Sequence, residues 1–294
     1  MRRWMIGLAL AFGLLPALIL AEDKASAELF APILVNGVVS EFFHYQTRFL
    51  FLEVSGTAES SALSVEAEVF DNDGNRVDPS LIFCAPSVVP ADGVLRFTLP
   101  AFGSLLTGTK GFVGIYEPTP GVLDGWVRIR TSGSGKLQAT VELLAFGHRL
   151  PGGVGCEPVM FVSTASSHYV SDALIQVEKP ATAFRASAVA TYSRQTAFSI
   201  VNPSDSQTAK VHIDLYDSSG TTIGHGMDLV LAPMHRASAF AREWMDVIDP
   251  PGVLTPQFYG SARISSDVPI VVGALQILYP EGKLVSTNVT PEGN

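Results

Sequence analysis

The chain has 294 residues, of which 16% are charged, and a formal net charge of −9. This evenly spread acidic balance argues against binding to nucleic acid or to an anionic membrane surface, because either partner requires a basic patch. The length is sufficient for two ordinary domains, each with a buried core.

An export signal is the first element that the sequence predicts. Arg2 and Arg3 precede an apolar run over residues 4–21, and residues 25–27 (ASA) have the small side chains of a cleavage site. We therefore expect residues 1–27 to be a signal peptide and the protein to be secreted, periplasmic or on the cell surface. An uncleaved N-terminal anchor is the alternative, because the run is nearly long enough to span a bilayer. No later apolar run has the length of a span, so we expect none in the mature chain.

Cys84 and Cys156 are the two cysteines of the chain. In an exported protein such a pair favours one disulfide over a metal site, which would need more ligands at closer spacing. The bridge would close a loop of about 70 residues and stabilise the fold by roughly 4 kcal/mol in the chain-entropy model. Two reduced thiols are the alternative.

The sequence indicates an internal duplication. Four blocks recur in the same order in both halves: residues 52–77 match 198–223, residues 88–97 match 231–240, residues 125–132 match 260–267, and residues 141–144 match 275–278. Recurrence of several blocks in one order is typical of a repeated structural unit.

The segment FDNDGNRVD, residues 70–78, has the composition of a calcium loop but the spacing of a turn. The duplication pairs residues 71–74 (DNDG) with residues 217–220 (DSSG), so only one Asp and the Gly are shared. A calcium loop needs several regularly spaced oxygen ligands and a late bidentate acid. A tight turn needs an Asp that bonds the following backbone and a Gly that accepts a positive φ. We expect hairpin turns and no metal site.

Strands are expected through most of the chain. Apolar and polar residues alternate over residues 65–69 and 211–215, which indicates half-buried antiparallel strands leading into the two hairpins. Further strands are expected at residues 126–130, 138–146, 261–264 and 270–279, and one short helix at residues 237–248.

The predicted fold class is all-β, with two tandem immunoglobulin-like antiparallel β-sandwiches after the signal segment. Each strand has an apolar face that a second sheet must cover, and about seven strands fit each copy. The first, divergent copy is expected over residues 28–150 and the second over residues 157–294. Residues 151–156 would form the hinge.

The second copy resembles an uncharacterised immunoglobulin-like β-sandwich repeat of exported bacterial proteins. The resemblance covers residues 192–278 and is carried by RQTAFSIVNPS, LYDSSG, LAPMHRASAF and FYGSARISSDVPI. The first copy departs from the pattern, since residues 56–58 (GTA) replace the NPS of residues 202–204. The repeat carries no established activity, so the resemblance implies a fold and an extracellular setting without a chemistry.

Sequence signatures of catalysis are missing. The chain has no nucleophile elbow, P-loop, zinc-protease motif or dinucleotide fingerprint. His212 and Asp214 share a strand face, but Glu66 and Glu68 take their places in the first copy, so a solvated polar strip explains both pairs. A glycosidase that uses paired carboxylates is a distant alternative. We expect a non-enzyme with no catalytic residues, cofactor or metal.

Exposed aromatic side chains are the remaining candidates for a site. Trp126, Tyr116 and Tyr259 are candidate ligand contacts that could stack on sugar rings, although such aromatics, like Trp244, often plug the end of a sandwich instead. The leading interpretation is a non-catalytic exported surface or envelope module for adhesion, assembly or spacing, with an envelope protein or polysaccharide as partner. A pair of polysaccharide-binding modules is the alternative.

Overall fold

The computed structural model describes most of the chain after the expected signal peptide. The described residues are 28–40, 43–55, 62–78, 93–108, 122–133, 135–147, 158–164, 169–179, 193–248, 258–279, 283–286 and 289–291. The expected signal peptide and hinge, both cysteines of the expected disulfide (Cys84 and Cys156), and Tyr116 lie outside them.

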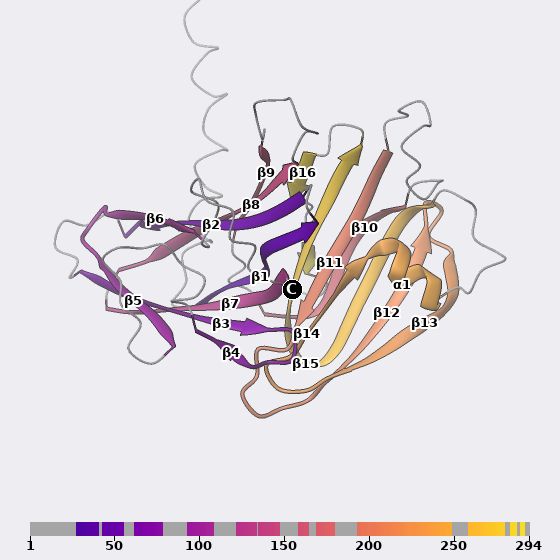
Figure 1. Cartoon of the computed structure of the whole chain (residues 1–294). Coiled ribbons are helices and arrows are strands. Elements are labelled where there is room, and N and C mark those ends of the chain that lie inside the picture. The colour runs from indigo at the N-terminus through magenta and orange to yellow at the C-terminus, as the bar shows by residue number, and fades with distance from the viewer. Residues whose placement is uncertain are drawn as a thin grey trace, which may run out of the picture.

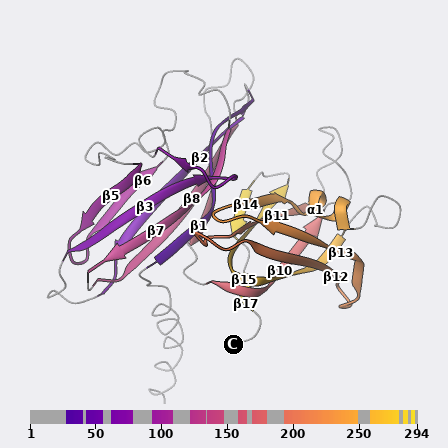
Figure 2. The same ribbon diagram turned by 90° about the horizontal axis from the view of Figure 1, so that it is seen from below.

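The described residues form two antiparallel sheets that lie side by side (Figures 1 and 2). The all-β prediction is confirmed. The first sheet contains β1 (Glu28–Ser40), β2 (Phe43–Glu53), β3 (Leu63–Asp71), β4 (Arg76–Val77), β5 (Val94–Leu99), β6 (Ser104–Gly108), β7 (Val122–Ser132), β8 (Leu137–Gly147) and β9 (Pro158–Thr164). The second sheet contains β10 (Val170–Lys179), β11 (Ser193–Val201), β12 (Ala209–Asp217), β13 (Thr222–Leu231), β14 (Arg236–Phe240), β15 (Phe258–Tyr279), β16 (Lys283–Ser286) and β17 (Val289–Pro291).

One strand in each sheet pairs with two different sets of neighbours. In the first sheet, β1 pairs with β7 through residues 28–37 and with β2 through residues 37–40. In the second sheet, β15 pairs with β10 and β12 through its first half and with β11 and β16 through its second half. Each sheet bends in this way and encloses a hydrophobic core of its own. Strand β9 extends the first sheet by pairing with β8, although it follows the expected hinge.

The short helix α1 (Ala241–Ile248) follows β14 and covers the core of the second sheet. Its Trp244 stacks on Phe198, with ring centroids 5.1 Å apart, and donates from Nε1 to the carbonyl oxygen of Ala239 at 3.2 Å. Trp244 therefore fills the core and is only 7% exposed.

The two hairpin turns have the geometry that the sequence predicts. In each turn one carboxylate oxygen of the Asp accepts from two backbone amides, those of residues 73 and 75 for Asp71 and of residues 219 and 221 for Asp217. Gly74 and Gly220 have φ values of 76° and 82°, a region open to glycine at little cost. The turns are thus closed by their own side chains.

Several pairings of the first sheet recur in the second. Asp71 lies opposite Gly125, as Asp217 lies opposite Gly260. A Cβ atom on either glycine would come within about 2 Å of a carbonyl oxygen on the neighbouring strand, at 2.1 Å for Gly125 and 2.0 Å for Gly260. Glycine is therefore required at both positions by the approach of the neighbouring backbone.

The predicted match of residues 88–97 with residues 231–240 is wrong. Strand β5, residues 94–99, pairs with β3, whereas β14 pairs with β11. It is β6 that corresponds to β14, since β6 pairs with β2 and follows the turn 99–103 (LPAFG) as β14 follows the turn 231–235 (LAPMH). The match rested on a Pro and a Phe that the two segments share, but the two segments pair with strands that do not correspond.

Substitution of Gly260 by Ala tests the close approach of β12 and β15. We expect the free energy of unfolding to fall by about 1–3 kcal/mol, because the new methyl group must displace backbone. Urea denaturation followed by circular dichroism measures the change. The control is Gly220→Asn, because Asn tolerates a positive φ and a Cβ atom there meets nothing within 4 Å. Equal stability of Gly260→Ala and the wild-type protein would contradict this packing.

Candidate functional site at the junction of the two sheets

A hydrophobic cluster joins the two sheets. Its members from the first sheet are Phe30, Phe70 and Trp126, and those from the second are Val201, Met234 and Val271. The Trp126 ring stacks on Phe70 with centroids 4.6 Å apart, and its Nε1 donates to the carbonyl oxygen of Met234 at 3.1 Å. Trp126 is 0% exposed, so the contact between the sheets covers it completely.

The turn between β13 and β14 carries Met234 into this cluster. The His235 amide donates to the Ala232 carbonyl at 3.1 Å, and Met234 has a φ of 63°. A positive φ is strained for a side chain like Met and persists only where surrounding contacts hold it. Here the Met234 amide also donates to the Ser204 carbonyl at 3.1 Å, which ties the turn to the preceding loop.

The buried guanidinium of Arg236 is the polar centre of the junction. It donates from Nε to Ser199 Oγ at 2.7 Å and from Nη1 to Asn72 Oδ1 at 2.8 Å, and it forms an ion pair with Asp124. Its backbone amide donates to the Asn72 carbonyl at 3.0 Å. Burial lowers the pKa of Arg236 below its ordinary value, while the attraction of Asp124 opposes that shift. Arg236 therefore binds residues from both sheets.

The hairpin turn that resembled a calcium loop is one half of this contact. A Cβ atom added to Gly74 would lie 3.1 Å from His235 Nδ1 and 3.1 Å from the Met234 side chain. Asn72, which the second hairpin replaces by Ser218, supplies both a backbone and a side-chain oxygen to Arg236. The turn at residues 71–75 thus packs against the turn at residues 233–236.

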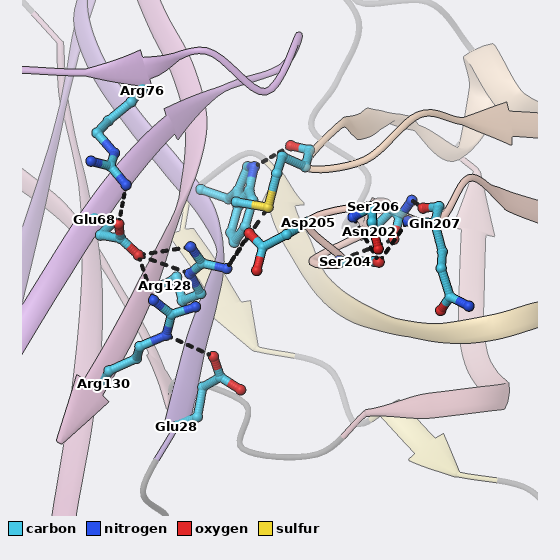
Figure 3. A network of polar contacts seen from close by, with 12 residues as sticks. Glu28, Glu68, Arg76, Arg128, Arg130, Asn202, Ser204, Asp205, Ser206 and Gln207 are labelled. Carbon is cyan, nitrogen blue, oxygen red and sulfur yellow. Dashed lines mark hydrogen bonds and ion pairs between the residues drawn. The ribbon is translucent and has the colours of Figure 1, made fainter. Parts of the chain in front are cut away.

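A second ionic network joins the two sheets through Arg128 (Figure 3). Arg128 is buried and donates from Nε to Glu68 at 2.9 Å within the first sheet and from Nη1 to Asp205 at 3.0 Å in the second. Glu68 also accepts from Arg130 at 3.3 Å and forms an ion pair with Arg76. Burial acts to lower the pKa of Arg128, but its bonds to Asp205 and Glu68 outweigh burial and raise it.

The NPS loop of the second sheet holds Asp205 in place (Figure 3). Asn202 is fully buried and donates from Nδ2 to the carbonyl oxygens of Gln207, Leu231 and Ala232 at 2.7–3.0 Å. Ser204 Oγ accepts from the Gln207 amide at 2.9 Å. The NPS residues therefore close the loop that contacts the first sheet, a role that the sequence alone did not indicate.

A cleft of about 300 Å³ opens beside the Arg236 network. Its walls come from both sheets and are largely apolar, with Ile33, Val35, Tyr45 and Leu143 on the first sheet and Ala197, Leu275, Ile277 and Phe240 on the second. Arg236, Asp124 and Ser238 form its polar end, where Ser238 Oγ donates to Asp124 at 3.2 Å. These polar groups bond one another, so they hold the junction together.

The two described candidate aromatics, Trp126 and Tyr259, differ in exposure. Trp126 is buried in the junction and offers no face to a sugar ring, because Phe70 and the Met234 turn cover it. Tyr259 on β15 is 55% exposed, and its hydroxyl accepts from Gln176 Nε2 at 2.9 Å. Among the described residues, Tyr259 alone of the three candidates presents an open ring.

His212 lies between two carboxylates on the outer face of the second sheet. Its Nδ1 is 2.7 Å from Asp228 and its Nε2 is 3.1 Å from Asp214. The bond to Asp228, with a smaller contribution from Asp214, raises the pKa of His212 above its ordinary value of 6.5. The described residues contain no group of three or more side chains placed to hold a metal ion.

Removing the Arg236 side chain tests the junction. We expect Arg236→Ala to lower the free energy of unfolding by about 3 kcal/mol, because the partly buried Asp124 loses its cation. The matched control is Arg263→Ala, whose half-exposed ion pair with Asp172 lies within the second sheet and contributes at most about 1 kcal/mol. Urea denaturation compares both with the wild-type protein, and equal losses for the two variants would contradict a special role of Arg236.

The histidine network predicts a pH dependence. The native state binds the His212 proton more tightly than the unfolded state, so the resulting stability is fully present below the unfolded pKa of about 6.5 and is lost as the pH rises through the folded pKa. An NMR titration of the ring protons should show a raised pKa that falls in Asp228→Asn. Glu66→Gln on the first sheet should leave the His212 pKa unchanged. An unshifted pKa in the wild-type protein would contradict these bonds.

The comparisons with known proteins add no relative. A scan against protein-family models and searches of curated proteins and of solved structures found no match to this chain. No helix among the described residues is long and apolar enough to cross a membrane. The function is therefore inferred from the chain's own residues, chiefly those that join the two sheets.

Proposed function

We propose that the chain is a non-catalytic exported module of the cell surface or envelope that serves in assembly or spacing. It consists of two tandem immunoglobulin-like β-sandwiches that arose by duplication. The recurring register of Asp71 with Gly125 and Asp217 with Gly260 supports the duplication. The apolar N-terminal run supports export.

The observation that carries this proposal is the locked junction. Met234 is buried in one cluster with aromatic rings of the first sheet, and the buried Arg236 binds Ser199 together with Asn72 and Asp124. At the same contact, Ser199 Oγ donates to the Pro32 carbonyl at 2.8 Å, and a Cβ atom on Gly273 would lie 2.3 Å from Pro32. A spacer needs a fixed angle between its units, which directional bonds and close packing provide.

The charged groups at the junction serve this structural role. Arg128, Glu68 and Asp205 form one chain of ion pairs, and Arg236 with Asp124 forms another. General acid–base catalysis requires a group that is able to exchange its proton with a substrate. These side chains form ion pairs with one another instead, which favours a structural function.

Polysaccharide binding is the second candidate, and the exposure of Tyr259 favours it. An aromatic ring that is 55% exposed on a sheet face is a suitable platform for a sugar ring. Depletion of the full-length exported chain by insoluble polysaccharides, with Tyr259→Ala as the variant, measures this activity. Depletion that Tyr259→Ala abolishes would support a binding module, and equal depletion of both proteins would exclude this tyrosine as the platform.

The spacer role is tested by the distance between the two sheets in solution. Spin labels carried by non-natural amino acids at the exposed positions Thr98 and Val230 report this distance by pulsed electron paramagnetic resonance. We expect a narrow distance distribution that broadens in Arg236→Ala, because the junction loses its central cation.

The control variant Arg263→Ala should keep the narrow distribution, since its ion pair lies within one sheet. Circular dichroism must show intact strands in all the proteins compared. A broad distribution in the wild-type protein would contradict the spacer role.

A further inference from the structure

The turn between β5 and β6 has the same conformation as the turn that docks at the junction. Among the described residues, Phe102 and Met234 are the two non-glycine residues with a positive φ, at 58° and 63°. In each turn the following amide donates back three residues, from Gly103 to Pro100 at 2.7 Å and from His235 to Ala232 at 3.1 Å. The first sheet therefore carries its own copy of the docking turn.

The Phe102 turn is held in its strained conformation by a buried carboxylate. Glu53 is 2% exposed and accepts from the Phe102 amide at 2.8 Å and from the Ser55 amide at 2.8 Å. An aromatic residue in the left-handed region is strained by about 1–2 kcal/mol, and such strained residues cluster at functional sites.

The two turns differ in what they contact. Met234 is buried between the sheets, whereas Phe102 is 59% exposed. Leu106, Leu50 and Leu52 on the adjoining strands β6 and β2 are 58%, 39% and 37% exposed, and Leu50 lies directly opposite Leu106. Phe102 thus stands at the edge of an exposed apolar surface, which is typical of an interaction site.

The second sheet has an open counterpart of the face that receives Met234. In the first sheet this face contains Phe70 opposite Trp126, and Phe30 opposite Arg128. By the same register, the second sheet has Tyr216 opposite Ser261 and Leu174 opposite Arg263. These four side chains are partly exposed, and Tyr259 beside them is open to solvent.

We propose that the chain binds a second copy of itself head to tail, with the Phe102 turn of one molecule on the Tyr216–Ser261–Leu174 face of the next. The contact would resemble the one inside the molecule, where the Met234 turn packs on the face formed by Phe30, Phe70 and Trp126. The proposed contact is also complementary in size. On the turn, Phe102 is larger than Met234, and on the receiving face Ser261 is smaller than Trp126. A contact between unlike surfaces does not close on itself and extends into an open chain.

This inference rests on the proposed assembly role and specifies its partner. Sedimentation velocity of the full-length exported chain over a range of concentrations tests it. We expect the mean mass to rise with concentration. Phe102→Gly should weaken self-association at least about tenfold, because it removes a central aromatic anchor. Glycine accepts the positive φ, so this variant should remain folded.

A second variant, Leu174→Glu, blocks the receiving face and keeps the Phe102 turn. At concentrations where the wild type self-associates, each variant alone should associate at least about tenfold more weakly, and an equimolar mixture should form dimers that do not grow further. Dimers in the mixture are specific to a head-to-tail contact, because each variant retains one of the two unlike surfaces.

Three results would overturn the proposal: a wild-type protein that remains monomeric at every concentration, variants that associate as the wild type does, or a mixture that fails to form dimers. The spin-label distance is measured within one molecule. A narrow distance in a monomeric wild-type protein would therefore reject head-to-tail binding and leave the spacer role intact.

Discussion

The burial of one arginine between two sheets is the constraint on which the arrangement of this protein depends. A guanidinium removed from water must find hydrogen-bond acceptors, or the fold loses several kcal/mol. Arg236 finds them in Ser199 of its own sheet and in Asn72 and Asp124 of the other. An apolar contact tolerates sliding and rotation, whereas these bonds are satisfied in one relative position of the sheets.

Matching positions in the two sheets have different roles. Asp71 and Asp217 close equivalent turns, and among the described residues the first turn contributes to the junction through Asn72. Trp126 and Ser261 occupy equivalent registers on β7 and β15. The tryptophan is covered by the other half of the chain, and the serine lies on a face without such cover among the described residues.

A junction held by directional bonds and an exposed Phe102 turn are features suited to assembly. The proposed spacer role depends on the junction, and the proposed head-to-tail contact would reuse the junction's own design. Neither proposal requires chemistry on a substrate. This agrees with the charged groups of the junction, which are paired with one another. The cleft beside Arg236 then follows from the meeting of two curved sheets.

The sequence alone indicated the all-β class, the two hairpin turns with the strands that lead into them, and the match of residues 125–132 with residues 260–267. Those features depend on alternating side chains and on turn residues close in the chain, so local physics specifies them. Only the tertiary structure decided that Trp126 is buried, that Asn72 binds Arg236, and that β6, not β5, corresponds to β14. Each of these depends on a contact between residues far apart in the sequence, and no local pattern records which distant face will cover a side chain.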